Sequence, residues 1–149
     1  MRTVEATRKP AATIQADGTI TEAARLMNEW TVGALVVLDG ERPVGIVTDR
    51  DLVLRALARA LPPEARVDGV MTADPLTVDG EADVRDAYRV FREHAIRRLP
   101  VIEDGRVVGM LSVDDLVIDL TQDLADIVRP VTGEVIFGHQ ERPAELARR

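Results

Sequence analysis

The stretch Val44-Gly45-Ile46-Val47-Thr48-Asp49-Arg50-Asp51-Leu52 returns later in the chain as Val108-Gly109-Met110-Leu111-Ser112-Val113-Asp114-Asp115-Leu116. The two glycines are 64 residues apart, and so are the two final aspartates. Residues 12–52 align with residues 76–116 at that spacing without a gap, and 11 of the 41 positions are identical. A duplication of this kind predicts two similar halves packed about a pseudo-twofold axis, with matched clefts at their junction.

Each copy has the pattern of a β-α-β-β-α unit. A short extended piece around Thr13, or around Thr77 in the second copy, precedes an apolar stripe at helical spacing. The residues before these helices have capping-box spacing: Thr19 with Glu22, and Asp83 with Asp86. Two apolar runs separated by Asp39-Gly40, and by Asp104-Gly105, predict a β-hairpin in each copy. The second helices are expected over residues 49–60 and 113–128, and a short strand over 131–137.

Composition narrows the classes of function. The 149 residues are 46% hydrophobic and include no cysteine, which excludes disulfides, thiolate metal sites and cysteine nucleophiles. A net charge of -7 argues against general nucleic-acid binding. The first residues carry no apolar run and no stretch is long enough to span a bilayer, so we expect a cytoplasmic protein without a signal peptide or a membrane partner.

The ordered motifs resemble those of a pair of CBS domains, a Bateman module. The two Gly-led stretches at residues 45–51 and 109–115 support this, together with residues 70–78 as the opening of a repeat and Arg98-Leu99-Pro100-Val101 as its second strand. The resemblance implies an α/β (α+β) fold of two packed repeats, at residues 4–64 and 65–128, followed by a C-terminal extension at 129–149. It also implies a regulatory module that binds AMP, ADP, ATP, S-adenosylmethionine or a dinucleotide between the repeats.

The repeated Thr48-x-x-Asp51 and Ser112-x-x-Asp115 spacing has two interpretations. It is a capping box, in which each side chain bonds the backbone N–H of the other at the start of a helix. It also suits nucleotide binding, because a hydroxyl and free N–H groups at a helix start favour phosphate, and an acidic side chain can accept the ribose hydroxyls. Since both copies follow a Gly-led strand, we expect the two roles together.

The resemblance implies that each cleft draws on both repeats. One group would contain a pair of arginines and would bind a phosphorylated ligand more tightly than the other, which has no charge at the equivalent positions. The first group is Thr48, Asp51, Ile46, Thr77, Ala82, Ile96, Arg97 and Arg98, with Arg50 nearby. The second group is Ser112, Asp115, Met110, Thr13, Gly18, Val32 and Gly33.

Three functions fit these features to different degrees. The leading prediction is a sensor that requires no cofactor, takes an adenine nucleotide as its regulatory ligand, and acts through a homodimer or an unidentified effector protein. Mg²⁺ is expected only as a companion of bound ATP, because the carboxylate spacing specifies no dedicated metal site. The alternative is a ligand-free structural or protein-interaction module. An enzyme is disfavoured, because the chain offers no cysteine, no convincing Ser-His-Asp set and no P-loop.

Overall fold

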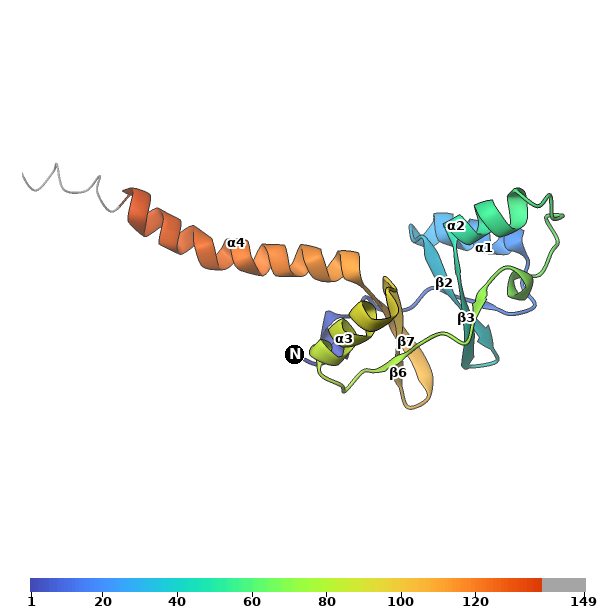
Figure 1. Cartoon of the computed structure of the whole chain (residues 1–149), viewed down its shortest axis with the longest axis horizontal. Coiled ribbons are helices and arrows are strands. Elements are labelled where there is room, and N and C mark those ends of the chain that lie inside the picture. Colours follow the sequence, from blue (N-terminus) through green and yellow to red (C-terminus); the bar gives the residue numbers. More distant parts are fainter. Residues whose placement is uncertain (138–149) are drawn as a thin grey trace, which may run out of the picture. The chain divides into compact units, whose positions relative to one another are not determined.

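The computed structural model describes residues 1–137 (Figure 1). Met1–Val113 form one compact unit that contains both sheets, and a second unit begins at Asp114. The architecture is the mixed α+β fold expected from the duplication. No helix within the described part of the chain is long and apolar enough to cross a membrane.

The first sheet has four strands in the order β1-β2-β3-β4, with bounds Thr13–Gln15, Ala34–Asp39, Arg42–Thr48 and Thr72–Ala73. Strand β1 is parallel to β2, whereas β3 is antiparallel to both β2 and β4. Helix α1 (Ile20–Trp30) buries Ala23 and Met27. The chain leaves β3 directly into the short α2 (Asp49–Asp51) and continues as the π-helical turn η2 (Leu52–Leu57), which buries Ala56 in the same apolar core.

The second sheet repeats this plan with three strands in the order β5-β6-β7, which span Val78–Asp79, Arg98–Glu103 and Arg106–Ser112. Helix α3 (Val84–His94) buries Val84, Ala87 and Phe91. Both hairpins carry an irregularity at equivalent places, between Val37 and Leu38 and between Val101 and Ile102. The duplication therefore extends to details of strand register.

The opening segment of each repeat pairs with the sheet of the other repeat. The N-terminal turn η1 (Thr3–Ala6) lies against the second repeat, where the backbone N–H of Thr3 donates to Ala82 (2.8 Å) and that of Val4 to Gly80 (2.9 Å). In the other direction, η3 (Val67–Gly69) and β4 lie against the first repeat. The pseudosymmetry is thus an exchange of opening segments, which ties the two sheets into one unit.

Two glycines make this exchange sterically feasible. A methyl group placed on Gly45 would collide with the Sδ atom of Met71 and lie 2.9 Å from the carbonyl oxygen of Thr72. A methyl group on Gly109 would collide with Cγ2 of Thr7 and lie 2.6 Å from the carbonyl oxygen of Arg8. At each glycine the close neighbour is the opening segment that crosses from the other repeat, and a residue with a side chain would hold that segment off.

Two local predictions need correction. In the first hairpin the turn is Gly40-Glu41, because Asp39 pairs with Arg42 as the last strand residue; Gly40 alone supplies a positive φ (63°) there. Asp83 caps α3 through the N–H of Arg85, and the Asp86 carboxylate instead accepts from Arg89.

The last helix is longer than predicted. Helix α4 runs over Val113–Phe137, so the short strand expected at residues 131–137 is wrong. Pro130 lies inside this helix, where the missing N–H removes one backbone bond without ending the helix. The remainder of the predicted C-terminal extension, residues 138–149, lies outside the described residues.

Candidate functional site

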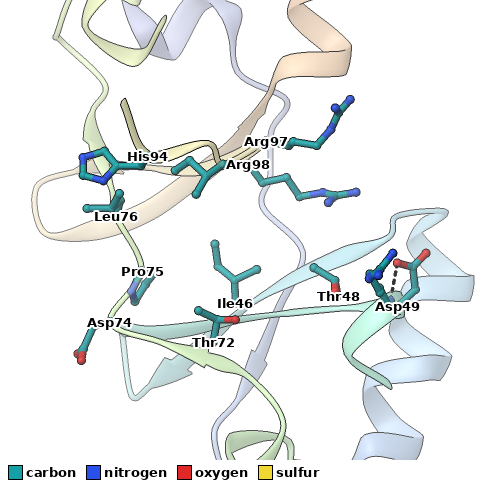
Figure 2. Close-up of a pocket in the computed structure, with 12 residues that line it drawn as sticks. Ile46, Thr48, Asp49, Thr72, Asp74, Pro75, Leu76, His94, Arg97 and Arg98 are labelled. Atoms are coloured by element: carbon teal, nitrogen blue, oxygen red, sulfur yellow. Dashed lines mark hydrogen bonds between the residues drawn. The ribbon is translucent and has the colours of Figure 1, made fainter. Parts of the chain in front are cut away.

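A cavity of about 660 Å³ lies at the junction of the two repeats, within the unit Met1–Val113. One wall comes from β3, the start of α2 and the crossing segment around β4. The other comes from the end of α3 and the start of β6 (Figure 2). Its lining comprises Ile46, Thr48, Asp49, Arg50, Thr72, Asp74, Pro75, Leu76, His94, Ile96, Arg97 and Arg98.

Charge and apolar surface are both present in this lining. Three arginines, Arg50, Arg97 and Arg98, outnumber the two carboxylates Asp49 and Asp74, so the cavity is locally cationic in a chain with a net charge of -7. Isoleucine, leucine and proline side chains provide apolar walls. An anionic ligand with a flat apolar portion suits this combination of surfaces.

Thr48 and Asp51 form the predicted capping box. The Thr48 hydroxyl accepts from the N–H of Asp51 (3.1 Å), and Oδ2 of Asp51 accepts from the N–H of Thr48 (2.9 Å). The other carboxylate oxygen of Asp51 lies 3.6 Å from Nε of Arg55. The capping role is confirmed, and ribose binding by Asp51 stays a prediction, because Asp51 is not among the residues that line the cavity.

Arg97 and Arg98 are positioned by the junction between α3 and β6. Ala95 takes a left-handed conformation (φ 51°) that ends α3, and the chain then turns into β6 at Arg98. The carbonyl of Arg97 accepts from the N–H of Val113 (3.0 Å). Figure 2 shows the Arg98 side chain extending toward the end of the cavity that holds Thr48 and Asp49, whereas His94 and Leu76 lie at the other end.

The first predicted group is brought together in part. The cavity contains Ile46, Thr48, Arg50, Ile96, Arg97 and Arg98, as expected. Thr77 and Ala82 do not line it. Thr77 is an exposed residue just before β5, and the carbonyl of Ala82 is occupied by the N–H and hydroxyl of Thr3 (2.8 and 2.9 Å).

The second predicted group is distributed over both compact units. Met110 and Ser112 end β7 at the positions equivalent to Ile46 and Thr48, and Thr13 lies in β1. Asp115 belongs to α4, in the unit that begins at Asp114, so the grouping around Asp115 stays a prediction. Gly18 packs closely on Ile14 and Glu22, and Val32 donates its N–H to the carbonyl of Met27 (3.0 Å). Gly33 lies beside Asp49 and Arg98, which line the first cavity.

Sequence reasoning missed a set of lining residues: Asp49, Thr72, Asp74, Pro75, Leu76 and His94. Most of them lie in the segment that crosses to the first sheet. Extending the 64-residue alignment upstream could have identified that segment, because the Arg8–Met110 bridge repeats the Thr72–Ile46 pairing. His94 ends α3 and also lines the cavity.

The comparisons with known proteins agree with this architecture. The CBS domain family matches twice, at residues 3–57 and 67–121. The chain belongs to the CBS domain family. These two CBS domains form a tandem pair, and the opening segment of the first domain, from residue 3, is the part that packs on the second repeat.

The CBS pair is similar in sequence to several known proteins. The chain is 40% identical over 97 residues to the uncharacterized protein YlbB of Bacillus subtilis, which covers 64% of this chain and 66% of that protein. It is 38% identical over 100 residues to Hypoxic response protein 1 of Mycobacterium tuberculosis, covering 66% of this chain and 70% of that protein.

Solved structures share the fold. The crystal structure of Hypoxic Response Protein I, with two coordinated zinc ions, has a TM-score of 0.71 at 31% identity and covers 78% of this chain and 97% of that one. A CBS domain protein from Pyrobaculum aerophilum, complexed with AMP, has a TM-score of 0.70 at 32% identity and covers 78% of this chain and 90% of that one. In the described part of the CBS pair, no three histidine, aspartate or glutamate side chains gather as a metal site.

Proposed function

We propose that this CBS pair is a regulatory module that binds an adenosine-type nucleotide reversibly in the cavity between its repeats. The observation that carries the proposal is the cavity of about 660 Å³, whose lining brings Arg97 and Arg98 of the second repeat together with Ile46 and Thr48 of the first. Support also comes from the Pyrobaculum relative that was crystallised with AMP.

The cavity chemistry suits each part of such a ligand. Guanidinium groups form charge-assisted hydrogen bonds to phosphate oxygens, which are stronger than bonds between neutral groups. The adenine would lie between aliphatic side chains, such as Ile46 and Ile96, because the chain is only 3% aromatic. The Thr48 hydroxyl lines the cavity as a further polar group on the side of the first repeat.

Binding, and not catalysis, is the function proposed for this cavity. A regulatory signal would then pass to an effector protein or through a change in assembly. Exposed apolar side chains on two elements could each take part in a homodimer interface: Val53, Leu54 and Leu57 on η2, and, separately, Val117, Leu120, Leu124 and Ile127 on α4. Light scattering of the purified chain tests the dimer, and a monomer at micromolar concentration would contradict it.

Calorimetry with AMP, ATP, S-adenosylmethionine and NAD tests the proposed ligand class. Replacing Arg98 with Gln removes a charge-assisted bond worth about 1.5–3 kcal/mol, so we expect the affinity for AMP to fall about tenfold or more. Arg42→Gln is the matched control, because Arg42 lies in the exposed hairpin and pairs only loosely with Asp39 (3.5 Å). Absence of heat and of thermal stabilisation with all four ligands at millimolar concentration would contradict the proposal.

A further inference from the structure

The Asp49 side chain occupies an unusual place in the cavity. Its Oδ1 atom accepts from the N–H of Arg50 (2.8 Å), and its own N–H donates to the carbonyl of Gly33 (3.0 Å). A methyl group placed on Gly33 would lie 3.1 Å from Oδ2 of Asp49 and 3.4 Å from Nη2 of Arg98. The carboxylate and the guanidinium therefore approach the same small space beside Gly33, at one end of the cavity (Figure 2).

The fold itself does not require a carboxylate at this position. At the 64-residue spacing, Asp49 corresponds to Val113 of the second repeat. Gly33 corresponds to Arg97, and Arg98 corresponds to Ala34 of the first repeat. The same backbone bond nevertheless forms there, from the N–H of Val113 to the carbonyl of Arg97 (3.0 Å). This backbone hydrogen bond therefore forms without a carboxylate side chain at the donor residue. The negative charge beside Arg98 is particular to this cavity.

We propose that Asp49 is a specificity-determining residue, which selects against ligands with long phosphate chains and favours nucleoside monophosphates. This inference rests on the proposed function. A phosphate on Arg98 would lie close to the Asp49 carboxylate, and each further phosphate adds negative charge next to it. Two unit charges about 4 Å apart repel each other even when screened as in bulk water, enough to change an affinity about fivefold. ATP, with about two more negative charges than AMP, is penalised more.

The experiment compares the affinities of AMP and ATP for the full chain, by calorimetry without divalent ions. Asp49→Asn removes the charge and keeps an oxygen that can accept from Arg50. We expect it to raise the affinity for ATP about tenfold, as about 1.4 kcal/mol of relieved repulsion implies, and the affinity for AMP by less than about threefold. In the double variant Asp49→Asn with Arg98→Gln this gain should disappear, because the phosphates would no longer be held beside residue 49.

Asp74→Asn is the matched control. Asp74 also lines the cavity and contributes one negative charge, and its positive φ (52°) is well tolerated by asparagine. In Figure 2 it lies away from Asp49 and Arg98, so its replacement should leave the ratio of the two affinities nearly unchanged.

Three results would overturn the inference. An unchanged ratio in Asp49→Asn would do so, and so would an equal change in Asp74→Asn. A loss of affinity for both nucleotides would indicate that Asp49 binds the ligand itself. In each of these cases wild-type binding of AMP leaves the proposed function intact. If neither nucleotide binds any of the chains, the proposed function fails and the role of Asp49 fails with it.

Discussion

Adding one methyl group at Gly109 is expected to destabilise the CBS pair strongly. The new Cβ would collide with Cγ2 of Thr7 and lie 2.6 Å from the carbonyl oxygen of Arg8. Neither neighbour can move without loss, because the Thr7 hydroxyl donates to the carbonyl of Thr3 (2.7 Å) and the carbonyl of Arg8 accepts from Met110 (3.2 Å). Overpacking costs about 1–3 kcal/mol and a broken backbone bond about 1 kcal/mol. We therefore expect a loss of about 3 kcal/mol.

The equivalent change at Gly45 should cost less. There the nearest obstacle is the flexible side chain of Met71, and the Thr72 carbonyl is 2.9 Å away. We expect Gly45→Ala to cost about 1–2 kcal/mol. Gly69→Ala is the matched control, because nothing lies within 4 Å of its added methyl. It should be neutral or stabilise the chain by up to about 1 kcal/mol.

Urea unfolding, followed by circular dichroism, measures all three variants. With a slope of about 2 kcal/mol per molar urea, Gly109→Ala should lower the midpoint by about 1.5 M, and Gly45→Ala by about 0.5–1 M. The reasoning would be refuted if Gly109→Ala lost no more stability than Gly69→Ala, since the exchanged segment would then not cross this glycine closely in solution.

Three further predictions concern single side chains. Asp51→Ala and Thr48→Ala should each cost about 1 kcal/mol in urea unfolding, the usual value of a helix cap. If Asp51 also binds ribose, calorimetry on the folded Asp51→Ala variant should show an affinity for AMP more than about tenfold weaker. The backbone N–H of Arg2 hydrogen-bonds to Glu5 and lowers the pKa of that carboxyl below its ordinary value of 4.5. The resulting stabilisation is complete above pH 4.5 and lost as the pH falls through the lowered pKa, so Glu5→Gln should lower the melting temperature at neutral pH, and the difference should vanish in acid. Thr31 ends α1 in a left-handed conformation (φ 53°), so Thr31→Gly should raise stability by about 1 kcal/mol; a loss in thermal unfolding would contradict that reasoning.

Much of each repeat could be predicted locally. The capping box at Thr19 and Glu22 and the one at Thr48 and Asp51 both form as their spacing indicates. The position of a cap or a turn is harder to predict where two neighbouring positions could each form it. Asp83 can cap α3 through either of two N–H groups, and the first hairpin places Gly40 at the first turn position although Asp39-Gly40 resembles a two-residue turn.

The sequence by itself determined the two repeats, their order of elements and the arginine asymmetry between them, because periodicity, caps and turns depend on neighbours along the chain. Only the tertiary structure decided which segments face one another across the cavity. The opening segments are exchanged between the sheets, so Thr72 joins Ile46 in the wall opposite Arg98, and Asp49 and Arg98 both come close to Gly33. Such contacts depend on how the two sheets pack against each other, which the local pattern of apolar residues, caps and turns does not specify.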